Sequence, residues 1–457
     1  MKTAWLKYQN NLGDVMAFND KYMDYLSNCK TERESVIESE KIAQDLGFVK
    51  FEDVKGPLKQ NDKVYFTNKE KNIALFVIGK ELVSAGINIL GAHIDSPRID
   101  VKQNPLYEDE GLALLDTHYY GGIKKYHWVA TPLAIHGVVC KMDGSKVTVN
   151  IGEDDSDPVL NISDLLPHLG KDQMQKKASV VIEGEDLNVL IGSIPAFTED
   201  ESEKELVKKN ILTILKNKYD MEEDDFMSAE LELVPAGKAR SLGLDSSMVI
   251  GYGHDDRVCA YTSLMALVES KDLERTACAI LVDKEEVGSA GATGAQSRFF
   301  ENIFAELIAN QEAYSDLKLR RALKASFMLS SDVSAGYDSN YAAAFEKKNT
   351  AFLGKGLCFN KYTGARGKSG CNDANPEYIA KIRKVMKDNN ITIQSSELGK
   401  VDQGGGGTIA YILANLEVDV IDAGIAVQNM HAPWEVVSKV DVYEAYLGYK
   451  AFLKDIK

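Results

Sequence analysis

Residues 277–288 read ACAILVDKEEVG, in which six apolar residues are followed at once by four charged ones. A near-continuous apolar run of this length is typical of a strand in a sheet that is covered on both faces. Glu285 and Glu286 then stand at the end of this strand, where two buried carboxylates are costly unless they are paired or bind a metal. The alternative is a charged helix N-terminus, because Gly288 fits a tight turn into a helix.

Four other short segments place an acid or a histidine after an apolar, strand-like run. They read GAHIDSP at 91–97, HDDR at 254–257, SSD at 330–332 and MHAP at 430–433. Ligands of open α/β sheets bind at the carboxyl ends of strands, so all five segments are expected there. Oxygen and imidazole groups without thiolates are the ligand set of hard or borderline divalent ions. The set predicts a hydrolase that activates water with a pair of bound metals.

His93 and Asp95 are two residues apart, so both side chains face the same side of an extended segment. The imidazole can bind a metal while the carboxylate holds it in place, although such a pair on its own better fits a core histidine. The adjacent Asp255 and Asp256 point apart in extended backbone. One of them can therefore bridge two metals while the other contacts backbone or Arg257.

The remaining two segments carry less information by themselves. Asp332 follows an apolar strand and could be a terminal metal ligand, but aspartate is also a common helix N-cap. His431 follows a strand and a polar turn, and a lone histidine is weak evidence. In the pair after residue 282, one glutamate could bind metal while the other acts as general base.

Composition excludes several function classes. The 457 residues include 53 basic and 69 acidic side chains, which give a net charge of -16 and argue against non-specific nucleic-acid binding or docking on an anionic membrane. No apolar run reaches the length of a bilayer span, and the N-terminus lacks an apolar signal core. These features predict a cytoplasmic protein. The six cysteines form no CxxC pair, so free thiols are expected.

The pattern of elements predicts two domains. Residues 5–46 are helical in spacing, and 73–78 and 87–92 are apolar strands. Short β-rich pieces, including 133–139, 147–151 and 180–182, fill residues 101–235 together with a charged helical stretch. Strands and helices alternate after residue 237, which predicts a three-layer α/β/α domain. The expected organisation is a first domain of residues 1–100 and 236–457, interrupted by a β-rich domain of residues 101–235.

Two further segments suggest substrate contacts. Residues 404–408 read GGGGT but lack the lysine of a phosphate loop and the spacing of a dinucleotide site. A loop that lets backbone line a pocket is the better interpretation, with Gly407 and Thr408 nearest the substrate and a flexible turn as the alternative. Residues 361–368 are basic and either recognise a substrate carboxylate or form a solvated loop.

Taken together, the segments resemble the M18 family of metallo-aminopeptidases, the aspartyl aminopeptidase group, over the full length and most closely its bacterial branch. The matching motifs are GAHIDSP, DKEEVGS at 283–289, SSDVSAGYDSNY at 330–341 and NMHAPWE at 429–435. The resemblance implies that the β-rich insertion is a dimerisation domain. It also implies a tetrahedral dodecamer built from dimers.

The resemblance assigns roles to individual residues. His93 and Asp332 would hold one metal, Glu286 and His431 the other, and Asp255 would bridge both. Glu285 would be the general base and Asp95 would support His93 as a catalytic residue. The metals would be two divalent ions, zinc first, with manganese or cobalt as alternatives.

Two departures from the family pattern concern the substrate. Eukaryotic members carry a Pro-His-Leu-Ala-Ile-His stretch, whereas residues 167–172 here read PHLGKD, so only His168 is matched. The basic segment matches loosely, with Lys361 and Arg366 as the cations that would receive an acidic N-terminal residue. The sequence thus predicts an aminopeptidase acting on peptides, with a related dipeptidase or deacylase, or a non-catalytic assembly protein, as alternatives.

Overall fold

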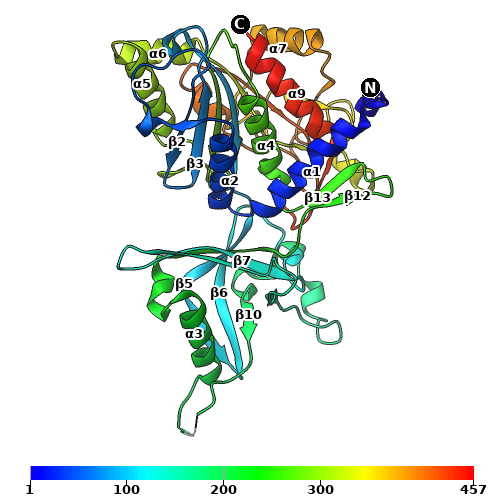
Figure 1. The fold of residues 1–457 in the computed structure, drawn as a ribbon. Helices are drawn as coiled ribbons and strands as arrows, with labels where there is room; N and C mark the ends of the chain where they lie inside the picture. The colour runs from blue at the N-terminus through cyan, green and yellow to red at the C-terminus, as the bar shows by residue number, and fades with distance from the viewer. Residues whose placement is uncertain (1, 199, 201) are drawn as a thin grey trace. The chain divides into compact units, whose positions relative to one another are not determined.

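The computed structural model describes residues 2–198, 200 and 202–457, and the chain divides into two compact units (Figure 1). The first unit contains the residues up to Ser96 together with Ala239–Met430 and Glu435–Lys457. The second unit contains Pro97–Lys238 and the short segment His431–Trp434.

The first unit is built on a nine-stranded mixed sheet. Its four central strands, β14, β4, β15 and β19, run parallel to one another. In spatial order the sheet contains β1 (Val49–Lys50), β2 (Lys63–Asn68), β3 (Asn72–Val77), β14 (Ala277–Val282), β4 (Asn88–His93), β15 (Phe327–Ser330), β19 (Asp419–Gly424), β17 (Leu357–Asn360) and β18 (Ile393–Ser395).

Helices cover both faces of this sheet. One face packs against α1 (Leu12–Asn28), α2 (Glu32–Asp45), α4 (His254–Val268), α7 (Pro376–Asp388) and α9 (Lys439–Asp455). The other face packs against α5 (Phe299–Gln311), α6 (Asp316–Lys324) and α8 (Ala410–Ala414). The predicted three-layer α/β/α architecture is therefore confirmed.

Strand β14 explains why the sequence run at 277–282 is apolar throughout. Ala279 and Leu281 point into the core beneath α4, while Cys278 and Ile280 point into the core beneath α5. All six residues of the strand are buried. A strand covered on both faces gains from apolar side chains at every position, not at alternate ones.

A second, smaller sheet also belongs to the first unit. It has five strands in the order β12 (Arg240–Leu242), β13 (Met248–Gly251), β21 (Glu435–Ser438), β20 (Ala426–Gln428) and β16 (Ser334–Ala335). Strands β13 and β21 pair antiparallel, with Val249 opposite Val437. This sheet matters for the site because α4 and the segment beyond β20 both follow its strands.

In its described residues, the second unit is a seven-stranded antiparallel sheet with one α-helix, α3 (Leu206–Tyr219). Its strands in order are β8 (Lys146–Ile151), β7 (Leu133–Cys140), β11 (Ala229–Pro235), β5 (Arg98–Asp109), β6 (Leu112–Tyr120), β10 (Val189–Gly192) and β9 (Asn161–Ile162). The predicted β-rich character of the insertion is thus present. The strand expected at 180–182 is absent: a 3-10 turn, Ala178–Val180, ends there instead.

Two more observations bear on expectations from composition. No helix in the described part of the chain combines the length and the hydropathy that a bilayer crossing requires. The six cysteines form no disulfide, and Cys29, Cys259, Cys278 and Cys358 are buried. The prediction of free thiols is confirmed.

Candidate metal centre

His93 is the last residue of β4 and is almost fully buried, at 2% exposure. Its Nδ1 lies 3.0 Å from the carbonyl oxygen of Asp95 and 3.3 Å from Oδ1 of the same residue. These acceptors favour a proton on Nδ1 and leave Nε2 as the ring atom that can bind a metal. Nε2 lies 3.2 Å from Oδ1 of Asp255 and 4.0 Å from Oε2 of Glu285.

Asp95 does more than support the imidazole. The backbone N–H of Glu285 donates to Asp95 Oδ1 and that of Glu286 donates to Asp95 Oδ2, both at 3.1 Å. Both glutamates lie in a 3-10 turn, Glu285–Val287, just beyond β14. A single buried carboxylate therefore fixes the turn that carries both glutamates.

Asp255 and Asp256 are held in different ways. Ser96 Oγ donates to the Asp255 carbonyl oxygen at 2.6 Å, and the Asp255 N–H donates to Glu435 Oε2 at 2.9 Å. Asp256 Oδ2 accepts the backbone N–H of His93 at 3.3 Å. The peptide bond between the two aspartates is cis. The Asp255 carboxylate lies next to the imidazole ring of His93, and the Asp256 carboxylate accepts from its backbone.

The candidate ligand atoms of the first unit fall into two overlapping groups. His93, Asp256 and Asp332 offer atoms within 4.8 Å of one another, and so do His93, Glu285 and Glu286. Such spacing lets a single cation touch every member of a group. His93 belongs to both groups, so the two cation positions would be neighbours.

Electrostatics indicate that this cluster fits bound cations. Burial raises the pKa of Asp256 well above its usual range, and burial together with the neighbouring Asp256 carboxylate does the same for Asp332. Burial alone would lower the pKa of His93, but the carboxylates of Asp255 and Asp95 raise it well above normal. In addition, Asp256 Oδ1 is buried and has no hydrogen-bond partner among the described residues. Crowded, desolvated carboxylates of this kind are stabilised by divalent ions.

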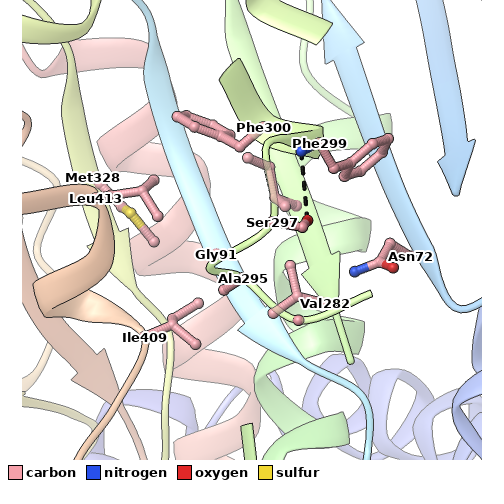
Figure 2. A pocket seen from close by; sticks show the side chains of 12 residues that line it. Asn72, Gly91, Val282, Ala295, Ser297, Phe299, Phe300, Met328, Ile409 and Leu413 are labelled. Carbon is pink, nitrogen blue, oxygen red and sulfur yellow. Dashed lines mark hydrogen bonds between the residues drawn. The ribbon is translucent and has the colours of Figure 1, made fainter. Parts of the chain in front are cut away.

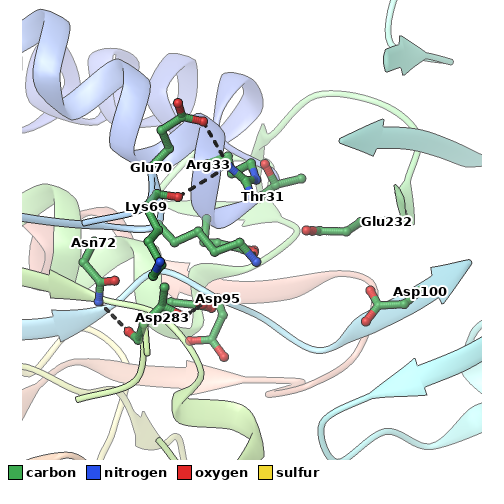
Figure 3. Close-up of polar contacts among 12 residues, drawn as sticks. Thr31, Arg33, Lys69, Glu70, Asn72, Asp95, Asp100, Glu232 and Asp283 are labelled. Atoms are coloured by element: carbon green, nitrogen blue, oxygen red, sulfur yellow. Dashed lines mark hydrogen bonds and ion pairs between the residues drawn. The ribbon is translucent and has the colours of Figure 1, made fainter. Parts of the chain in front are cut away.

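Asp283 near Asp95 belongs to a further set of buried charged groups (Figure 3). Lys71 Nζ is 3.0 Å from Glu32 Oε1, and Asp283 accepts the Thr293 hydroxyl at 2.6 Å. Burial raises the pKa of Asp283 to about 6, with the carboxylates of Glu32 and Asp95 adding to the effect. No sequence pattern indicated these buried charged groups.

The pocket in Figure 2 lies close to the same strands but has a different character. Gly91 and Val282 line it on the sheet, two and three residues before the predicted ligand His93 and the predicted base Glu285. The other lining residues are Asn72, Ile280, Gly294, Ala295, Ser297, Phe299, Phe300, Met328, Ile409 and Leu413. None of these side chains is an acid, a base or a metal ligand, so the chemistry is assigned to the carboxylate cluster.

Comparison with known proteins gives the family. The family described as "Aminopeptidase I zinc metalloprotease (M18)" matches residues 25–453. The chain belongs to the M18 family of zinc metallo-aminopeptidases. The predicted family and the predicted enzyme class, a metallo-aminopeptidase, are confirmed.

Relatives and solved structures agree with this assignment. A "Probable M18 family aminopeptidase 1" of Clostridium acetobutylicum is 60% identical, covering 99% of this chain and 98% of its own. The crystal structure of an M18 aminopeptidase from Thermotoga maritima has a TM-score of 0.94 at 43% identity, covering 99% of both chains. The S. cerevisiae mApe1 dodecamer, at 19% identity and 95% coverage of both chains, has a TM-score of 0.75 and shows the fold alone.

In this M18 aminopeptidase, His431 begins the short segment His431–Trp434, which belongs to the second unit. Its Nδ1 is 2.8 Å from the carbonyl oxygen of Gly122, within the same unit. This contact favours a proton on Nδ1 and leaves Nε2 as the possible ligand atom. The expectation that every site segment ends a strand of one sheet is wrong, because Asp255 follows β13 and His431 follows β20, both in the five-stranded sheet.

The predicted substrate-binding segments at 361–368 and 404–408 lie against each other. An added Cβ at Gly405 would be 2.6 Å from Ala365 Cα, and the Gly406 N–H lies 3.4 Å from the Thr363 carbonyl oxygen. Gly407, by contrast, has nothing within 4 Å of an added Cβ. The glycines at 404 and 405 therefore permit close packing, and the open space lies at 407.

The predicted cations for an acidic substrate differ in their surroundings. Lys361 Nζ is 3.8 Å from Asp373 Oδ1, and Lys368 Nζ is 3.0 Å from Oδ2 of the same carboxylate. Arg366 is exposed in a left-handed turn at φ 52°. His168 is exposed in the second unit. Among the described residues, no hydrogen bond or ion pair joins any of these side chains to the proposed metal ligands.

Three residues at the site were not singled out from sequence. Glu435 and Ser96 anchor the backbone of Asp255, and both lie inside matching motifs where they could have been noticed. Gly424 is less visible: an added Cβ there would be 1.9 Å from the Asp332 carbonyl oxygen. A side chain at 424 would therefore push on the candidate ligand Asp332.

Proposed function

We propose that this M18 aminopeptidase removes N-terminal residues from peptides with two divalent metal ions and a glutamate general base. The observation that carries the proposal is the pair of overlapping groups around His93, which contain the proposed ligands Asp332 and Glu286, with Asp255 Oδ1 at 3.2 Å from His93 Nε2. Two adjacent groups support two cation positions better than one. The M18 resemblance assigns His93 and Asp332 to one ion.

The same resemblance assigns Glu286 and His431 to the other ion, with Asp255 as the bridge. Asp255 is preferred to Asp256 as the bridge because Asp255 Oδ1 faces His93 Nε2 at 3.2 Å, whereas Asp256 contacts the His93 backbone. When bound, the ions would lower the pKa of water and polarise the scissile carbonyl. Zinc is the first choice, from the family description and from a donor set of imidazole and carboxylate, with manganese or cobalt as alternatives.

Glu285 is placed to move the proton. Its turn is fixed by Asp95, and its carboxylate lies 4.0 Å from the imidazole that would hold a metal. One oxygen of Glu285 would accept a proton from the attacking water and then deliver it to the nitrogen of the leaving amine. Asp95 acts by holding this turn and the imidazole in register.

We further propose that the enzyme acts as an assembly. The β-rich second unit would be the dimerisation domain, and the dimers would build a tetrahedral dodecamer. The support is the family resemblance together with the dodecameric state given for S. cerevisiae mApe1. Deleting residues 101–235 should give smaller species in size-exclusion chromatography with light scattering, and an unchanged large particle would contradict the assignment.

Preference for acidic N-terminal residues is the most specific part of the proposal. Lys361 and Arg366 are the candidate cations, and the carboxylate of Asp373 already faces Lys361. A substrate carboxylate must therefore compete with Asp373 for Lys361, whereas Arg366 has no ion pair among the described residues. Matched aspartyl and leucyl arylamides would measure the preference directly, and faster cleavage of leucyl substrates would refute it.

Glu285→Gln tests the mechanism. The amide keeps the size of the side chain but cannot accept the proton, so kcat should fall by about a thousandfold or more while two metals remain bound. The matched control is Glu377→Gln, an exposed residue of α7, which should leave the rate unchanged. Near-normal activity of Glu285→Gln, or loss of its metal, would refute the role.

The alternatives are distinguished by substrate. A deacylase would hydrolyse an N-acetylated amino acid, and a dipeptidase would stop at dipeptides, whereas an aminopeptidase needs a free amino terminus and accepts longer peptides. A non-catalytic assembly protein would bind stoichiometric metal without turning over peptide arylamides.

A further inference from the structure

Asp422 is a buried carboxylate that the proposed reaction does not use. It lies on β19 in the first unit and is 1% exposed. Neither of its carboxylate oxygens has a hydrogen-bond partner among the described residues. A charged group in this situation is strongly disfavoured unless something compensates it.

The neighbours of Asp422 supply oxygen atoms. Ser330 on β15 stands directly opposite Asp422 in the parallel register, and its hydroxyl is also buried without a partner among the described residues. The hydroxyls of Thr408 and Ser330 interact with the carboxylate and lower its pKa. Burial acts in the opposite direction and is stronger, raising that pKa to about 6.

The other strand beside Asp422 offers no donor. Asn360 on β17 is its antiparallel partner, but the Asn360 amide already donates to Ser334 Oγ at 2.7 Å and its oxygen accepts from Ser396. No basic side chain is among the described groups that influence Asp422. The side chains that act on the carboxylate among the described residues are thus two hydroxyls, neither of which carries a charge.

We propose that Asp422, Ser330 and Thr408 form a binding site for a monovalent cation, separate from the divalent metal centre. Oxygen atoms are the ligands that hard cations prefer. A single carboxylate neutralises one positive charge, which favours potassium or sodium over a divalent ion. The inference goes beyond the proposed peptidase activity and does not depend on it.

The position of Thr408 gives the cation a structural consequence. Thr408 ends the glycine-rich segment 404–408, and its Oγ1 accepts the N–H of Ala410 at 3.3 Å. A cation bound to both Thr408 and Asp422 would link this segment to strand β19, the neighbour of β15 in the sheet. Binding should therefore stabilise the folded chain and order the open backbone at Gly407.

Thermal unfolding of the zinc-loaded full-length protein tests the proposal. Potassium chloride and sodium chloride would each be titrated against choline chloride at constant ionic strength. The wild type should show a saturable rise of a few degrees in its midpoint with at least one of the two metal cations. Equilibrium dialysis with atomic emission should find one additional equivalent of that cation per chain.

Variants decide the outcome. Asp422→Asn should lose the cation response, whereas Asp402→Asn, an exposed acid in the same region, should keep it. If Asp422→Asn does not fold, Ser330→Ala and Thr408→Val replace it, and each should raise the half-saturating concentration by about tenfold. Equal midpoints in all three salts, or an undiminished response in these variants, would overturn the proposal in favour of a protonated or hydrated carboxyl.

Discussion

Substituting Asp95 by asparagine should separate positioning from metal binding. In the native structure the Asp95 carboxylate accepts two backbone N–H groups, from Glu285 and Glu286, each at 3.1 Å. Asparagine has one acceptor oxygen, so one N–H keeps its partner while the other faces an amide NH2. The turn that carries the proposed base would then be held on one side only.

The size of the effect follows from the lost contact. A hydrogen bond to a charged group contributes about 1.5–3 kcal/mol, and each 1.4 kcal/mol is about a factor of ten in rate. Asp95→Asn should therefore lower kcat by about ten- to a hundredfold. Asp95→Ala removes both acceptors, so it should lower kcat by about a hundred- to ten-thousandfold.

The assay is steady-state cleavage of an aminoacyl arylamide with metal content measured on the same sample. Asp95→Asn should retain its metals, because His93 and the other ligands are unchanged, and KM should move less than kcat. The control is Asp388→Asn, an exposed residue of α7 that pairs with Lys384. A wild-type rate in Asp95→Asn, or a loss of rate explained entirely by lost metal, would refute the positioning role.

Three other outcomes are expected. Asp255→Ala should lower metal content more than Asp256→Ala because a bridging ligand serves both ions; plasma emission spectroscopy on the purified variants measures this, and the reverse order would exchange their roles. Chelation should lower the thermal unfolding midpoint by exposing the buried carboxylates to mutual repulsion, and zinc should restore it; an unchanged midpoint would contradict a bound cation. Gly424→Ala should destabilise the protein by at least about 1–3 kcal/mol in denaturant unfolding and weaken metal binding, because the new Cβ would be 1.9 Å from the Asp332 carbonyl oxygen. If Gly424→Ala keeps the wild-type stability, the backbone near Asp332 must move to accept the new Cβ at little cost, and the prediction is wrong.

Much of the site is visible in the sequence because its residues follow strong local signals. An apolar strand covered on both faces is recognisable in one dimension, and the acids after β14 and β15 stand out against it. The contacts of Asp95 with Glu285 and Glu286 join residues 190 and 191 positions apart. No local pattern encodes such a pairing, so the second function of Asp95 appeared only in three dimensions.

Two errors have physical causes. Strands β13 and β20 are short, and β13 pairs with β21 from a distant part of the chain, so the sequence could not distinguish them from strands of the main sheet. Residues 180–182 are β-branched, but strand preference depends on having a neighbouring strand and a packed face. In the structure only Ile182 of this group is buried, and the backbone turns instead.

The second unit interrupts the chain between Ser96 and Ala239, and its first and last strands, β5 and β11, are neighbours with Ile99 opposite Leu233. This pairing has a consequence for the order of folding. If the insertion folds first, the loop that must close to bring His93 near Asp255 shrinks from about 160 residues to roughly 30, which lowers the entropic cost of closure by roughly 1.5 kcal/mol. The halves of the metal centre should therefore assemble late, after an independently folded insertion has drawn its own ends together.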